Sequence, residues 1–182
     1  GSKFGAYWHQ DGQFWRPPLH NVLSVLHCQS VPPAGGETGF ADLRAALATL
    51  SQPLRERAAS ASIVASVRDI ADFAAGDEED LAKFPNATHR FIQPHALDGG
   101  PVLYVGSPHM VVEGLETREA GRDLLTMVLT HATSPSFTYF HAWDAGDVVV
   151  WDNTQTLHHS MPYDRSSPDV VRELYRTQAR FA

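Results

Sequence analysis

The chain has 182 residues with 43% hydrophobic and 19% charged side chains, which is typical of one globular domain with a substantial core. The formal net charge is −7 and no basic cluster occurs, so phosphate backbones would be repelled, which argues against nucleic-acid binding. No apolar run approaches the length of a membrane span, and the single cysteine, Cys28, favours a reducing, cytoplasmic compartment.

The first third of the chain predicts short strands and two short helices. An aromatic-rich strand end over residues 7–15 precedes an apolar strand over residues 21–31, which stops at a Pro-Pro-Ala-Gly-Gly turn. Asp42 can cap a helix over residues 43–50. The other elements expected here are a helix over residues 51–59 and a strand over residues 62–67.

The middle of the chain predicts a loop, a hairpin and one long helix. Residues 71–90 are rich in acidic side chains and are expected to form a mobile lid, with a plain solvated loop as the alternative. An Asp-Gly-Gly turn between residues 91–94 and 101–106 predicts a hairpin. Apolar residues at helical spacing over residues 117–132 predict an amphipathic helix.

The last third predicts further strands. Residues 137–141 and 147–151 are expected to be strands around a glycine turn. A Pro-, Asp- and Ser-rich turn over residues 163–169 predicts that residues 170–176 return as another strand. Many short strands with a few helices are typical of a barrel or jelly roll with helical additions. We therefore expect a single, mainly β domain over residues 1–182.

Two arginines near the end of the chain are spaced for one face of a strand. Because side chains alternate along a strand, Arg172, Leu174 and Arg176 would project to the same side. Two guanidinium groups that face a common space predict a site for carboxylates. The alternative is a solvated helix face, because arginines recur at four-residue intervals as far as Arg180.

Ten histidines in a chain of this length prompt a search for a metal site. His9 alone has a carboxylate two positions later, Asp11, and residues i and i+2 on a strand project to the same side. A distant histidine would complete a two-histidine, one-carboxylate face with open metal positions. His158 or His159 is the natural partner, although adjacent histidines are also common at a polar strand end.

Four motifs, in this order, resemble those of the TauD/TfdA branch of the iron(II)/2-oxoglutarate oxygenases. WHQDGQF is similar to the family's metal-binding WHxDxxF, and PPAGGETGFADLRAAL is similar to its P-x-x-GGxT-x-F-x-D block. GDVVVWDNTQTLH is similar to the GDxxxWDNxxxxH motif that carries the distal histidine, and RELYR to the closing R-x-x-x-R. The resemblance extends from Trp8 to about Ala179.

The resemblance implies a double-stranded β-helix, which is a jelly-roll barrel of the cupin type, flanked by helices. The implied iron(II) ligands are His9, Asp11 and His158, whereas His159 would point away or pack. With 2-oxoglutarate as co-substrate and O2, such a protein would hydroxylate or otherwise oxidise a small organic or amino-acid-like acid and release succinate and CO2. Asp11 argues against halogenation, because related halogenases carry a small residue there.

The resemblance also implies which residues bind the organic reactants. Thr38, in GGET, matches the threonine that hydrogen-bonds 2-oxoglutarate, and Arg172 matches the arginine that pairs with its far carboxylate. Arg176 matches a position that holds an anionic group of the prime substrate. His20 and Trp15 are further candidate substrate contacts, with ordinary packing as the alternative.

Family members carry a substantial segment before the HxD motif, where this chain has eight residues, so we expect an upstream segment that adds strands and substrate contacts. The expected partner is a small-molecule substrate, without nucleic acid or membrane, and a homo-oligomer is compatible with the sequence. Two other functions stay open. One is a non-catalytic jelly roll that binds a small ligand, and the other is a zinc- or manganese-dependent hydrolase or isomerase, in which Arg172 has no evident role.

Overall fold

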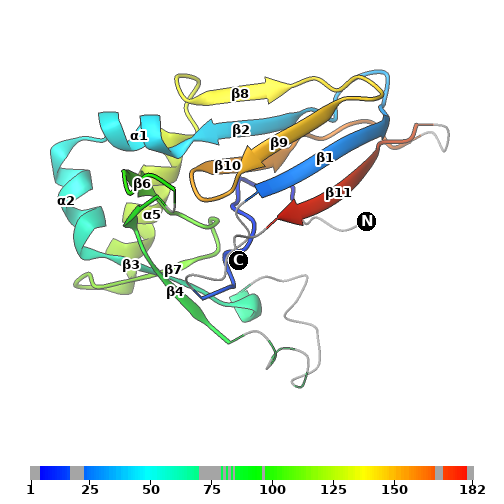
Figure 1. Ribbon diagram of the computed structural model, residues 1–182. Helices are drawn as coiled ribbons and strands as arrows, with labels where there is room; N and C mark the ends of the chain where they lie inside the picture. The colour runs from blue at the N-terminus through cyan, green and yellow to red at the C-terminus, as the bar shows by residue number, and fades with distance from the viewer. Residues whose placement is uncertain are drawn as a thin grey trace.

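The computed structural model describes residues 5–16, 23–69, 79, 81, 83, 85–95, 97–166 and 170–179. Within these ranges, antiparallel strands form four sheets, and the helices gather at one end of the molecule (Figure 1). The expected mainly β architecture with helical additions is confirmed. The described strands form separate sheets of two or three strands and do not close into a barrel.

Two antiparallel sheets of three strands each carry the residues expected at the functional site. Their strands are β1 (Leu23–Ser30), β2 (Thr38–Asp42), β8 (Thr138–His141), β9 (Val148–Asp152), β10 (Thr156–Ser160) and β11 (Glu173–Ala179). The first sheet has the order β11-β1-β9 and the second the order β10-β2-β8 (Figure 1). Phe40 on β2 contacts Trp151 on β9, with ring centroids 5.4 Å apart, so the two sheets face each other at this point.

Side-chain alternation on β11 places Arg176 on the inner face of the first sheet, and Arg172, which immediately precedes β11, lines the same cavity as Arg176. Leu174 and Arg176 line the same cavity as Trp151, whereas Tyr175 between them is 60% exposed on the outer face. The helical alternative for this segment is wrong, because residues 173–179 form a strand. β11 pairs with β1 rather than with β9, so the last strand of the described residues lies beside the first one.

The remaining strands form a third sheet, of order β4-β3-β7, and a hairpin of β5 and β6. They are β3 (Ser62–Ala65), β4 (Ala87–Arg90), β5 (Ile92–Pro94), β6 (Pro101–Leu103) and β7 (Val111–Glu113). The hairpin expected around the Asp-Gly-Gly turn is confirmed. β4 occupies the end of the expected lid loop, so residues 87–90 belong to a sheet, while residues 71–78, 80, 82 and 84 of that loop lie outside the described residues.

The α-helices with described bounds are α1 (Leu43–Thr49), α2 (Gln52–Ser60) and α5 (Arg118–Ala132), all at expected positions. Asp42 caps α1, because its carboxylate accepts hydrogen bonds from the backbone N–H groups of Arg44 and Ala45, each at 2.9 Å. The predicted apolar stripe of α5 faces the main core; its buried members are Leu124, Leu125 and Val128. No helix among the described residues is long and apolar enough to cross a membrane.

Candidate metal centre

The backbone brings His9 and His158 together from opposite ends of the chain. They form an isolated antiparallel bridge, in which the N–H of His9 donates to the carbonyl of His158 at 2.9 Å and the reverse bond measures 2.8 Å. The expected strand end over residues 7–15 is therefore limited to one bridge, and residues 11–14 form a turn. Because β10 belongs to the second sheet, this bridge fixes the HxD segment to that sheet.

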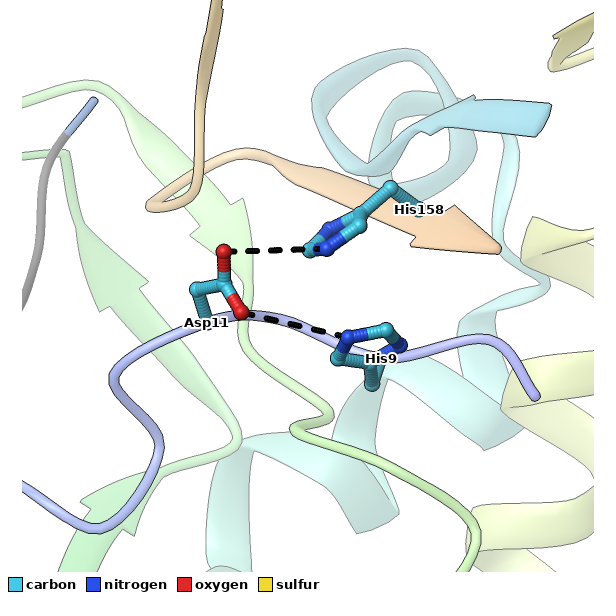
Figure 2. Close-up of side chains that lie close together, drawn as sticks. All are labelled: His9, Asp11 and His158. Atoms are coloured by element: carbon cyan, nitrogen blue, oxygen red, sulfur yellow. Dashed lines mark ion pairs between the residues drawn. The ribbon is translucent and has the colours of Figure 1, made fainter. Parts of the chain in front are cut away.

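Figure 2 shows Asp11 facing both histidine rings. One ligand atom from each of His9, Asp11 and His158 can be chosen so that all three lie within 4.8 Å of one another. The Nε2 atom of His9 lies 3.9 Å from Oδ1 of Asp11, and the Nε2 atom of His158 lies 3.7 Å from Oδ2. All three side chains are buried. His159 points elsewhere and stacks on Trp8 at 5.4 Å between ring centroids.

The protonation states of this cluster suit a metal ion. Nδ1 of His9 lies 2.9 Å from the carbonyl oxygen of Tyr7, which can only accept, so Nδ1 carries the hydrogen and Nε2 keeps its lone pair. Burial lowers the pKa of His9, and burial together with His9 lowers the pKa of His158 to about 3. Both rings are therefore neutral near neutral pH, the form that binds metals.

Asp11 completes the donor set as a carboxylate. Burial by itself would raise the pKa of this carboxyl, but His158, Arg176, His9 and a hydrogen bond from Ser24 outweigh it and lower the pKa. Two neutral imidazoles and one carboxylate, with no thiolate, match the facial triad that binds iron(II) and leaves metal positions open. The described residues thus fit an iron(II) ion.

The depressed pKa of His158 predicts how the metal-free protein responds to acid. Below about pH 6.5 the unfolded chain takes up a proton that the folded chain excludes, so the free energy of unfolding should fall as the pH drops from 6.5 toward 3. The slope from this one group should approach about 1.4 kcal/mol per pH unit. Urea unfolding of chelator-treated protein at about pH 7 and about pH 5 measures it. An equally steep fall in His158→Asn would contradict this assignment.

One cavity of about 270 Å³ joins the candidate metal centre to the other predicted residues. Thr38, Arg172 and Arg176 line it together with His9 and His158. The structure therefore brings together, in one place, residues taken from all four sequence motifs.

Arg172 is held in a fixed orientation on the wall of this cavity. Its Nε atom donates to the carbonyl of Gly36 at 2.8 Å, and its Nη2 atom donates to Oγ1 of Thr38 at 3.2 Å. Gly36 has a φ of +77°, a conformation that favours glycine, and a Cβ there would lie 3.1 Å from Cδ of Arg172, so a larger residue would push against the arginine side chain. Burial lowers the pKa of Arg172, yet a guanidinium remains protonated at neutral pH.

Trp143 was not singled out by the sequence, although it bonds directly to a predicted site residue. Its indole N–H donates to Oγ1 of Thr38 at 3.0 Å. Because Oγ1 of Thr38 already accepts hydrogen bonds from Trp143 and Arg172, the hydroxyl hydrogen of Thr38 remains available to donate to a ligand. No pattern around Trp143 in the sequence indicates this contact.

The other residues predicted to contact the substrate are Arg176, Trp15 and His20. Nη1 of Arg176 lies 3.5 Å from Oδ1 of Asp11, and the side chain is 47% exposed, so Arg176 stands at the open side of the cavity. Trp15 is exposed and is not among the residues that line the cavity. His20 lies outside the described residues.

Ser24 and Gln178 are also functional candidates that the sequence analysis missed, because both donate hydrogen bonds to Asp11. The signal available for Ser24 was a hydroxyl on the same side of the strand as Leu26 and Cys28.

Comparisons with known proteins place this chain in a family. The family described as "Taurine catabolism dioxygenase TauD, TfdA family" matches residues 1–178. The chain is 36% identical over 175 residues to the alpha-ketoglutarate-dependent 2,4-dichlorophenoxyacetate dioxygenase of Cupriavidus pinatubonensis, which covers 94% of this chain and 60% of that protein. It is 29% identical over 173 residues to the (S)-phenoxypropionate/alpha-ketoglutarate-dioxygenase of Sphingobium herbicidovorans, and this match covers 90% of this chain and 59% of that protein. The chain thus spans about 60% of the length of these curated relatives.

Solved structures agree with the sequence comparison. The structure of AAD-2 in complex with Mn(II) and N-oxalylglycine superposes with a TM-score of 0.83 at 30% identity, over 96% of this chain and 68% of that one. A taurine dioxygenase from Burkholderia xenovorans superposes with a TM-score of 0.76 at 31% identity, over 96% and 56%. With the family match over nearly its whole length and these relatives in both sequence and structure, the chain belongs to the TauD/TfdA family of dioxygenases.

Proposed function

We propose that the protein is an iron(II)- and 2-oxoglutarate-dependent oxygenase that hydroxylates or otherwise oxidises a small organic acid, releasing succinate and CO2. The observation that carries this proposal is the single cavity lined by His9, His158, Thr38 and Arg172, with Asp11 facing both histidines. A metal triad alone would suit several enzymes. The guanidinium of Arg172, held in a fixed orientation beside the triad, is explained by an anionic co-substrate.

In this proposal, His9, Asp11 and His158 hold iron(II), which would supply the dioxygen chemistry that couples decarboxylation of 2-oxoglutarate to substrate oxidation. Arg172 pairs with the far carboxylate of the co-substrate, and the hydroxyl of Thr38 donates to it. The protein's part is to orient the reactants and to keep water away. The apolar side chains of Leu26, Trp151 and Leu174 in the cavity wall serve this second task.

Arg176 is proposed to hold an anionic group of the prime substrate, since its partly exposed guanidinium stands at the open side of the cavity. The names of two relatives point to aryloxyalkanoic acids, and such acids combine a carboxylate with an apolar ring. We infer that the substrate is a small organic acid and that phenoxyacetates and phenoxypropionates are the first compounds to screen.

The two sheets that face each other at Phe40 and Trp151 are proposed to be halves of a jelly-roll barrel, within one catalytic domain. Two features support this: all strand pairs among the described residues are antiparallel, and the site lies between the two sheets, where barrels of this class hold ligands. The lid role expected of residues 71–90, of which 87–90 form β4, and the cytoplasmic location expected from the single cysteine stay predictions.

Anaerobic addition of iron(II) and 2-oxoglutarate tests the proposal. We expect a visible absorption band from charge transfer between iron(II) and a chelating keto acid, and succinate formation once O2 and a suitable acid are added. The band should be absent in His9→Ala and present in His27→Ala, which truncates an exposed histidine on β1. Folded wild-type protein without the band would contradict the function and favour a non-catalytic ligand-binding role.

A further inference from the structure

Among the described residues, hydrogen bonds to the carboxylate of Asp11 reach one of its two oxygens. Oδ2 accepts a hydrogen bond from Oγ of Ser24 at 2.8 Å and another from Nε2 of Gln178 at 2.9 Å. Oδ2 also lies 3.7 Å from Nε2 of His158, but these two hydrogen bonds already occupy it. The described residues donate no hydrogen bond to Oδ1, which lies 3.9 Å from Nε2 of His9 and 3.5 Å from Nη1 of Arg176. The two oxygens of this carboxylate are therefore not equivalent.

The direction of each hydrogen bond in the network around Oδ2 of Asp11 follows from which of its groups can only donate. The indole N–H of Trp151 can only donate, so the atom it meets at 2.8 Å is the Oδ1 oxygen of Asn153. Nδ2 of Asn153 then faces Oγ of Ser24 at 2.8 Å and donates to it. Nε2 of Gln178 donates to the same Oγ at 3.0 Å. With two N–H donors already on Oγ, the single hydroxyl hydrogen of Ser24 goes to Asp11.

Sheet register aligns these donors. Ser24 on β1 pairs directly with Gln178 on β11 and with Trp151 on β9, so the three residues form one row across the first sheet. Side chains of one row project to the same face, which here is the face toward Asp11. Most of this hydrogen-bond network is buried: Ser24 and Asn153 are 0% and 1% exposed, and Trp151 is 6% exposed. Hydrogen bonds in such a low-dielectric setting hold a carboxylate firmly.

We propose that Ser24 and Gln178 are positioning residues that reserve Oδ2 of Asp11 and leave Oδ1 as the oxygen presented to a divalent cation. Asp11 would then bind the cation through a single oxygen, which keeps the remaining metal positions open for co-substrate and O2. The inference rests on the proposed metal centre and deepens it. Outer partners of this kind orient a ligand without touching the metal.

Titration with Mn(II) alone, without co-substrate, tests the inference on the whole chain. Ser24→Ala and Gln178→Met should each weaken Mn(II) binding by about 10- to 100-fold, the usual effect of removing such a partner. Because both residues donate to one oxygen, the double variant should lose less than the product of the two effects. The thermal midpoint of the metal-free protein, measured in parallel, reports any purely structural effect.

Matched controls come from β1 itself. Ser30→Ala removes a hydroxyl that donates to the carbonyl of Val171, and Gln29→Met removes an amide that contacts His27; neither should change Mn(II) binding. If Ser24→Ala does not fold, Gln178→Met alone tests the inference. Gln178 is half-buried on an edge strand, so its replacement should disturb the fold less.

The possible results separate this inference from the function on which it rests. Weaker Mn(II) binding in the two variants, with unchanged controls, supports it. Wild-type protein that binds Mn(II) while both variants bind equally well overturns the positioning role and leaves the proposed function intact. Wild-type protein that binds no Mn(II) overturns the metal centre and the inference together.

Discussion

His158→Ala is expected to weaken Mn(II) binding by more than about 100-fold and to abolish succinate formation, whereas His159→Ala leaves both intact. Loss of a partner outside the metal's ligands typically costs about 10- to 100-fold in affinity, so loss of a ligand should cost more. Removing His158 leaves only His9 and Asp11 in the group of three. Mn(II) titration and a succinate assay with 2-oxoglutarate measure the two effects.

The control is informative because the two histidines are neighbours on β10 and face opposite sides of the sheet. His158 contacts Trp151 in the cavity, with ring centroids 4.9 Å apart, while His159 stacks on Trp8. His159→Ala should therefore lower only the free energy of unfolding, by about 1 kcal/mol for a lost aromatic contact. Equal loss of Mn(II) binding in both variants would show that the cluster depends on the local fold of β10 rather than on one ring.

The elements that the sequence predicted well are those determined by neighbouring residues. The helix over residues 117–132 has an apolar stripe and a capping Thr117, both local signals, and it begins at Arg118. The strand over residues 38–42 was not predicted, because it is short and lacks clean alternation of apolar and polar residues. It is stabilised by pairing with residues 156–160, far away in the sequence, and local patterns cannot show such pairing.

The site residues also differ in whether local sequence patterns could predict them. The spacing of His9 and Asp11 predicted that they would face one space, because i and i+2 residues share a side locally. The choice of His158, and of Thr38 and Arg172, came from resemblance, since no local rule relates them to His9. Ser24 and Gln178 were missed because only the register of β1 against β11 places them in one row. A shift of that register by one residue would turn Gln178 to the opposite face.

Arg172→Met should raise the 2-oxoglutarate concentration needed for half-maximal turnover by about 30-fold to several thousand-fold. Truncating one partner of a desolvated, hydrogen-bonded charge pair costs about 2–5 kcal/mol, and about 1.4 kcal/mol corresponds to a factor of ten. Methionine retains much of the apolar stem, so packing beside Gly36 is largely preserved. At saturating 2-oxoglutarate the maximal rate should be far less affected, because the metal ligands and Arg176 are unchanged.

Arg165→Met is the matched control for Arg172→Met, because it removes the same charge from a side chain that lies exposed over the ring of Tyr163. Arg165 also contributes to the electrostatic environment of Arg172, so a general loss of positive potential would appear in both variants. The structure gives Arg172 two fixed hydrogen bonds, to Gly36 and Thr38, and among the described residues no hydrogen bond occupies its Nη1 atom. That atom is therefore free to bind a carboxylate, and an unchanged requirement for 2-oxoglutarate in Arg172→Met would place the co-substrate elsewhere in the cavity.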